Sequence, residues 1–191
     1  MELKLFTDLI DALGKVAGGL KALVNLPKTE REAMHRTLDE TYRLIDTTIN
    51  MVIIRLGDLL LNVADAEFLR EAARLDNYNE WMKAEREFRL CRSLRVALRE
   101  TETLAGMVAG AVSAKDWDAL LQQMQSILAT EGELALFIGQ QFQQRASDAR
   151  SAGQDTRRTQ SIRDALMAFR TALIAERQEL IKQELELYTI V

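Results

Sequence analysis

The stretch that most constrains the fold runs from Thr29 to Val63 and contains no proline. Its apolar residues recur at steps of three and four positions, the spacing that places side chains on one face of an α-helix. They are Met34, Leu38, Tyr42, Ile45, Ile49, Val52, Leu56, Leu59 and Val63. With a rise of about 1.5 Å per residue, such a helix is roughly 50 Å long. An apolar stripe of that length is buried only when other long helices lie beside it.

The rest of the chain supplies those helices. It has a single proline, few aromatic residues and no strand-like alternation of β-branched residues, which favours an all-α protein. We predict one domain over residues 1–191, built as an antiparallel up-and-down bundle of four long helices with an N-terminal amphipathic helix and one short helix. The predicted long helices cover 29–63, 79–112, 117–149 and 156–188, and the two accessory helices cover 2–26 and 66–75.

The start of the first long helix carries two signals. Pro27 ends the preceding helix, because the residue before a proline avoids the helical region. Thr29 and Glu32 form the Thr-x-x-Glu pattern of a capping box, which predicts that the helix begins at Thr29.

Composition argues against catalysis and against a metal or cofactor. The chain has one histidine, His35, and one cysteine, Cys91, so a nucleophile and base pair has almost no candidates. Glu32 and His35 match one Glu-x-x-His element of a di-iron bundle, but a second histidine is absent and the ligand set is incomplete. We therefore predict a non-enzyme without cofactor, metal or small-molecule substrate, and a cytoplasmic location, since the N-terminal acids interrupt any signal-peptide pattern.

A row of basic residues is the first candidate partner surface. Its members recur every three or four positions: Lys83, Arg86, Arg89, Arg92, Arg95 and Arg99. Glutamates are interleaved with them, which is typical of a solvated face with ion pairs, and the same row also suits an acidic protein partner. Nucleic acid is the weaker alternative, because no stacking aromatics accompany the row. A second basic group, Arg145, Arg150, Arg157, Arg158 and Arg163, has the same alternatives.

The N-terminal segment 1–26 is the second candidate. It is amphipathic, contains glycines and is separated by Pro27, as in helices that leave a bundle and lie on a membrane. Its apolar side includes Leu3, Phe6, Ile10, Leu13 and Leu20. In outline this arrangement resembles the HeLo-type four-helix domains of cell-death effectors, a resemblance that covers the order of the helices only and implies a membrane-perturbing activity. The alternative is that the segment packs on the bundle as a further helix.

The leading hypothesis is a helical protein that works through protein–protein contact, as an adaptor, an assembly component or a homo-oligomer. Apolar coverage at Met51–Ile54 and Leu59–Leu61 is wider than one core needs, which favours a further contact surface. A membrane-perturbing effector that uses residues 1–26 is the alternative, and a nucleic-acid accessory protein is a third reading.

Overall fold

A computed structural model describes residues 4–22, 27–77, 96, 99 and 114–188. Every secondary-structure element within these residues is an α-helix, which confirms the all-α prediction. The predicted helix at 79–112 lies outside the described residues except at Val96 and Arg99. The antiparallel bundle of four long helices therefore stays a prediction.

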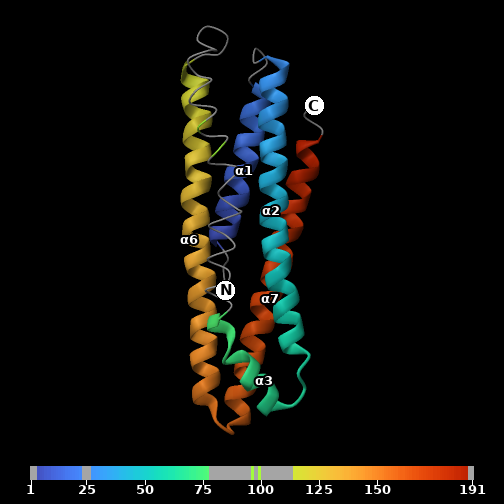
Figure 1. The fold of residues 1–191 in the computed structure, drawn as a ribbon, viewed down its shortest axis with the longest axis vertical. Coiled ribbons are helices and arrows are strands. Elements are labelled where there is room, and N and C mark those ends of the chain that lie inside the picture. The colour runs from blue at the N-terminus through green and yellow to red at the C-terminus, as the bar shows by residue number, and fades with distance from the viewer. Residues whose placement is uncertain (1–3, 23–26, 78–95, 97–98, 100–113, 189–191) are drawn as a thin grey trace.

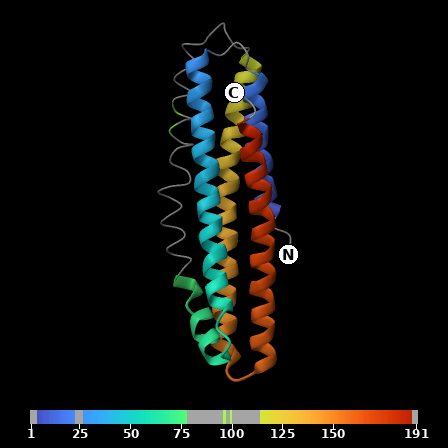
Figure 2. The same cartoon turned by 90° about the vertical axis from the view of Figure 1, so that its right-hand side faces the viewer.

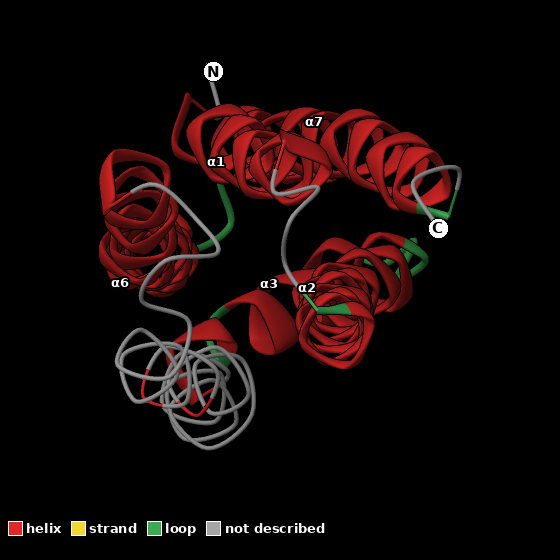
Figure 3. Ribbon diagram, turned by 90° about the horizontal axis from the view of Figure 1, so that it is seen from above, coloured by secondary structure: helices red, strands yellow, loops and turns green. Residues whose placement is uncertain are grey.

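The described helices run along the long axis of an elongated molecule (Figure 1). Their bounds are Lys4–Ala22 for α1, Lys28–Leu60 for α2, Asp65–Ala72 for α3, Ala114–Ala152 for α6 and Thr156–Leu187 for α7. The short helix α3 lies between α2 and α6 at one end of the molecule, as the view from above shows (Figure 3).

The predicted capping box at Thr29 is wrong. Pro27 is the N-cap, with φ −52° and ψ 145°, and α2 begins at Lys28. The backbone carbonyl of Pro27 accepts a hydrogen bond from Arg31 N at 3.1 Å. Proline's fixed φ already gives the extended entry that a cap needs, so Thr29 falls inside the first helical turn. The sequence also predicts Asp65 as the cap of the short helix, but the N-cap of α3 is Ala64.

The sequence predicts a turn at Ser151–Gln154 from its small and polar residues, and in the structure the connection between α6 and α7 covers residues 153–155. Gly153 has φ 60°, a left-handed conformation that glycine adopts without steric cost. Asp155 then caps α7, because its carboxylate accepts from the backbone N–H groups of Arg157 and Arg158 at 3.0 and 3.3 Å. The short turn makes α6 and α7 run in opposite directions.

Helices α2 and α7 lie side by side in opposite directions (Figure 2). Three arginines of α7, spaced seven residues apart, reach across to α2 and to the segment that directly follows it: Arg163, Arg170 and Arg177. A spacing of seven keeps a side chain on the same helix face, so these residues form one row. We call this row and its α2 partners the arginine seam.

The partners of the seam follow α2 in reverse order. Arg163 donates to the backbone carbonyls of Asn62 and Val63 at 2.6 and 3.2 Å. Arg170 Nε donates to the carbonyl of Ile53 at 3.2 Å, and its guanidinium lies against Gly57.

The last arginine of the seam makes the strongest contact. Arg177 meets the carboxylate of Asp46 with two hydrogen bonds, of 2.6 and 3.1 Å, the planar geometry that makes arginine pairs specific. The seam therefore fixes the register of the two helices from Asp46 to the C-terminal end of α2.

Helix α1 is a structural part of the core. The sequence predicts an accessory helix over residues 2–26. In the structure, Ile10, Leu13 and Val16 are buried in the main hydrophobic core. Packing is most extensive against α6 and continues on α7 and α2. Gly14 faces Gln183 of α7 so closely that a Cβ at this position would lie 3.1 Å from Gln183 Oε1. The glycine that weakens this helix by itself thus permits its close approach to α7.

Replacing Leu13 by alanine tests the role of α1. Leu13 is 0% exposed, so Leu13→Ala is expected to lower the free energy of unfolding by about 2–4 kcal/mol. Chemical denaturation measures the change, with Leu136→Ala on α6 as the control because Leu136 is 59% exposed. Equal, small effects of the two substitutions would show that α1 is not part of the folded core.

Candidate functional site

The predicted basic row lies almost wholly outside the described residues. Lys83, Arg86, Arg89, Arg92 and Arg95 belong to that part, as does Cys91. Arg99 is described and is exposed to solvent. The assignment of this row as a partner surface therefore stays a prediction.

The predicted membrane or partner helix is partly described. Ile10 and Leu13 are buried in the core, Phe6 and Leu20 are placed in α1 without a description of their side chains, and Leu3 lies outside the described residues. A membrane role would therefore require α1 to separate from α6 and α7 and to expose side chains that the fold buries. In the described part of the chain, no helix has a stretch apolar enough to cross a bilayer.

Most arginines of the second basic group, namely Arg145, Arg150, Arg158 and Arg163, bind groups of their own chain. Arg150 donates to the carbonyl of Ala73 at 2.9 Å and to Asp76 at 2.8 Å. Arg158 donates to the carbonyl of Ser151 at 3.0 Å. Guanidinium groups that hydrogen-bond carbonyls and carboxylates of their own chain have fewer donors left for an external phosphate.

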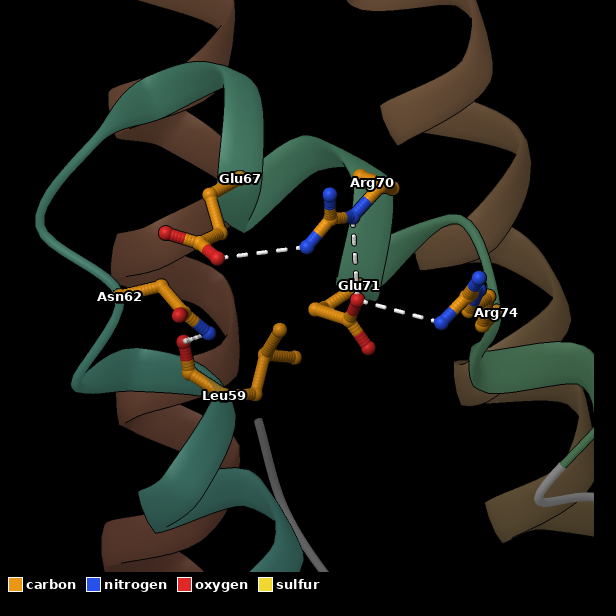
Figure 4. Close-up of polar contacts among 6 residues, drawn as sticks. All are labelled: Leu59, Asn62, Glu67, Arg70, Glu71 and Arg74. Atoms are coloured by element: carbon orange, nitrogen blue, oxygen red, sulfur yellow. Dashed lines mark hydrogen bonds and ion pairs between the residues drawn. The ribbon is translucent and has the colours of Figure 1, made fainter.

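Helix α3 has its own polar contacts (Figure 4). Arg70 pairs with Glu67 and Glu71 at 3.2 Å, and Glu71 also pairs with Arg74 at 3.2 Å. Asn62 Nδ2 donates to the carbonyl of Leu59 at 3.1 Å, at the end of α2. These pairs are mostly exposed, so each contributes little to stability.

A denser polar cluster lies beyond Arg177, where the C-terminal end of α7 meets α2. Tyr188 donates from its hydroxyl to Asp39 and accepts from Arg43 at 3.2 Å. Arg43 also pairs with Asp39 at 3.2 Å and with Glu184 at 3.9 Å. The ring of His35 lies 6.0 Å from that of Tyr188. These groups bind each other across α2 and α7, so the cluster fastens the C-terminal end of α7.

Burial changes the proton affinity of two groups near this cluster. Burial, followed by the charge of Asp39, raises the pKa of the Glu184 carboxyl. Burial also raises the pKa of the Tyr42 hydroxyl well above its usual range, and this hydroxyl donates to Gln183 Oε1 at 3.5 Å. Tyr42 therefore stays protonated and acts as a structural donor. Within the described ranges, no group of three or more potential ligands is placed to hold a metal ion.

The outer side of the α2–α7 pair is the feature that best fits a binding surface. Ile54 is 50% exposed, Leu61 76% and Met167 56%. Because α2 and α7 are antiparallel with Arg170 opposite Ile53, Met167 lies along the seam between the levels of Ile54 and Leu61. Ile54 and Leu61 are seven residues apart and share one face of α2.

This outer side is also poor in charge. Residues 47–54 of α2 contain no charged residue, and the exposed Asp58 lies between Ile54 and Leu61 on the same helix face. Residues 165–175 of α7 contain one charged residue, Arg170, whose side chain turns to α2. The exposed residues of this part of α7 are Met167, Ala168, Thr171 and Ala175. We use the name outer face for the exposed residues within 47–61 and 164–182 that lie on the same side of the α2–α7 pair as Ile54, Leu61 and Met167.

The sequence pointed to one half of the outer face. Excess apolar coverage at Met51–Ile54 and Leu59–Leu61 predicted a further contact surface, and Ile54 and Leu61 are the exposed members of these stretches. The α7 half was missed, because only its inward apolar stripe was considered. The available signal was the low number of charges over residues 165–175.

Comparison of the chain with protein families, with curated proteins and with solved structures finds no match.

Removing the two-pronged contact of the seam should destabilise the fold. Arg177→Ala leaves the carboxylate of Asp46, which is three-quarters buried, without its guanidinium partner. We expect the free energy of unfolding to fall by about 1–2 kcal/mol. Lys28→Ala is the control, because the Lys28–Glu32 pair is exposed and lies within one helix. Chemical denaturation compares them, and equal effects would contradict a structural role for the seam.

The pH dependence of stability tests the environment of Glu184. A carboxyl whose pKa is raised by folding favours the folded state at acidic pH, and this contribution is lost as pH rises through the folded-state pKa. Replacing the carboxylate by an amide removes that loss. Glu184→Gln should therefore be more stable than the unaltered protein at neutral pH, with the difference shrinking on acidification. Thermal unfolding over a pH series measures it, and a difference that is constant with pH would contradict the assignment.

Proposed function

We propose that the chain is a helical interaction protein, an adaptor or assembly component, that contacts another protein through the outer face. The observation that supports this proposal is the exposure of Ile54, Leu61 and Met167 on one side of the molecule, where residues 165–175 of α7 expose no charged residue. Single exposed apolar residues are ordinary on a monomer, whereas a contiguous group indicates an interaction site.

The chemistry of the outer face fits a protein partner. Solvent-facing positions of a helix are typically charged or polar, and here alanine, threonine, methionine and isoleucine occupy several of them. Small side chains let a second backbone approach, and Met167 is unbranched and adapts to irregular surfaces. The charge between Ile54 and Leu61 is the exposed carboxylate of Asp58, and a negative charge there is unsuited to phosphate groups.

We also propose that the whole chain forms the antiparallel bundle of four long helices that the sequence predicts. The opposite directions of α2 and α7, and of α6 and α7, support this arrangement. In such a bundle the inward stripes are buried by each other, so the outer face is left for a partner.

The alternatives receive less support. A membrane-perturbing effector would have to release α1, with Ile10 and Leu13 leaving a buried environment. A nucleic-acid accessory protein would need free guanidinium groups, and Arg150, Arg158 and Arg163 are bound to the chain itself.

Crosslinking in the cells that express the full chain tests the proposal. Crosslinked species heavier than a single chain are expected, and Met167→Glu should abolish them, because a glutamate would have to lose its water on contact. Leu136→Glu is the matched control, since Leu136 is similarly exposed but lies on α6. Circular dichroism verifies that both variants fold. The absence of heavier species, or their equal loss in both variants, would refute the proposal.

A further inference from the structure

Helix α7 carries a second periodic face, opposite its buried one. The buried stripe of α7 includes Ile162, Leu166, Phe169, Leu173 and Leu180. On the solvent side, exposed residues recur at steps of four and three: Asp164, Ala168, Thr171, Ala175, Gln178 and Lys182. Residues at this spacing form one straight face of a helix, and the centre of this face carries the small side chains of Ala168, Thr171 and Ala175. Within the described residues, one side of α7 is buried in the core and this face is exposed to solvent.

When two copies of this face pair antiparallel, the charges of one copy are complementary to those of the other. Asp164 lies at one end and Lys182 at the other, with four uncharged residues between them. Two parallel copies would place Asp164 against Asp164 and Lys182 against Lys182. Two antiparallel copies, paired so that each position meets its counterpart across a two-fold axis, place Asp164 against Lys182 at both ends.

We propose that the outer face binds a second copy of this chain, with α7 packed antiparallel on α7 of the partner subunit around a two-fold axis. In this register Thr171 lies opposite Ala175 of the partner subunit, and Ala168 lies opposite Gln178 of the partner subunit. The small side chains at the centre permit close approach of the two backbones. The two ends are each closed by an ion pair between Asp164 and Lys182 of the partner subunit.

Residues beside this face add apolar contact area. Met167, Ile174 and Ile181 follow one another at intervals of seven on the α2 side of α7, and Ile54 of α2 is exposed next to them. Antiparallel pairing brings the Met167–Ile181 row of each subunit alongside that of the other. A two-fold interface uses the same patch on both subunits, which this self-complementary pattern provides.

The existing contacts of the two end residues do not prevent this pairing. Asp164 accepts from Gln160 at 2.7 Å and Lys182 pairs with Glu179 at 3.4 Å, and all four residues are exposed. Exposed pairs of this kind exchange partners at small cost. Arg157 lies seven residues, about two turns, before Asp164. A register shifted by one heptad brings either Arg157 or no charge against Lys182. The charges therefore select one register.

Charge reversal in the purified full chain tests this inference, which rests on the proposed function. Sedimentation equilibrium should show a monomer–dimer equilibrium for the unaltered protein. Asp164→Lys and Lys182→Asp, each alone, should raise the dimer Kd by roughly tenfold, because two pairs change from attraction to repulsion. The double variant that carries both substitutions should restore dimerisation to within about threefold of the unaltered protein. Asp118→Lys on α6 is the charge-matched control and should leave Kd unchanged.

The outcomes separate the two proposals. A purified chain that stays monomeric at every concentration, while its crosslinked species in cells still depend on Met167, would overturn the second-copy inference and leave the proposed function standing. A dimer that responds to neither single charge reversal, or that the double variant fails to restore, would overturn the α7 pairing. If the purified chain does not dimerise and cells contain no Met167-dependent crosslinked species, both the proposed function and the second-copy inference are overturned.

Discussion

The arginine seam between α2 and α7 is the contact on which the other features depend. Arg163, Arg170 and Arg177 repeat every seven residues. Arg170 and Arg177 meet Ile53 and Asp46 of α2, and Arg163 meets backbone carbonyls just after the end of α2. Apolar burial holds two helices together but allows them to slide, because it is not directional. Hydrogen bonds to fixed carbonyls and a two-pronged carboxylate contact are directional, so the seam sets one register. That register brings Met167 between the levels of Ile54 and Leu61, and it places Tyr188 beside Asp39.

The seam also explains why the α7 part of the outer face has few charges. Arg170 is the sole charged residue over 165–175, and its guanidinium turns from solvent to the carbonyl of Ile53. The remaining exposed residues of this stretch are small or apolar. Residues 165–175 of α7 therefore expose no charged side chain, and this part of the helix belongs to the surface that we propose for association.

Much of the fold follows from the sequence, and the failures have physical causes. Three- and four-residue spacing located α2, α6 and α7 to within a few residues, and the turn at Gly153 followed from its composition. The cap at Thr29 was wrong because Pro27 already supplies the extended entry. Burial of Ile10 and Leu13 could not be separated from membrane binding, because an amphipathic face indicates an apolar neighbour without saying which. The seam was missed because arginine bonds to backbone carbonyls of a distant helix leave no pattern in the α2 side chains.

The central claim is that the seam makes α2 and α7 one structural unit. Native-state hydrogen exchange of the full chain tests it most directly, because it reports the free energy at which each segment opens. The account predicts that the slowest amides of 42–59 and 162–180 open together, with one common free energy, and that Arg177→Ala lowers both equally. Opening of α7 at a clearly lower free energy than α2, with α2 unaffected by the substitution, would contradict it.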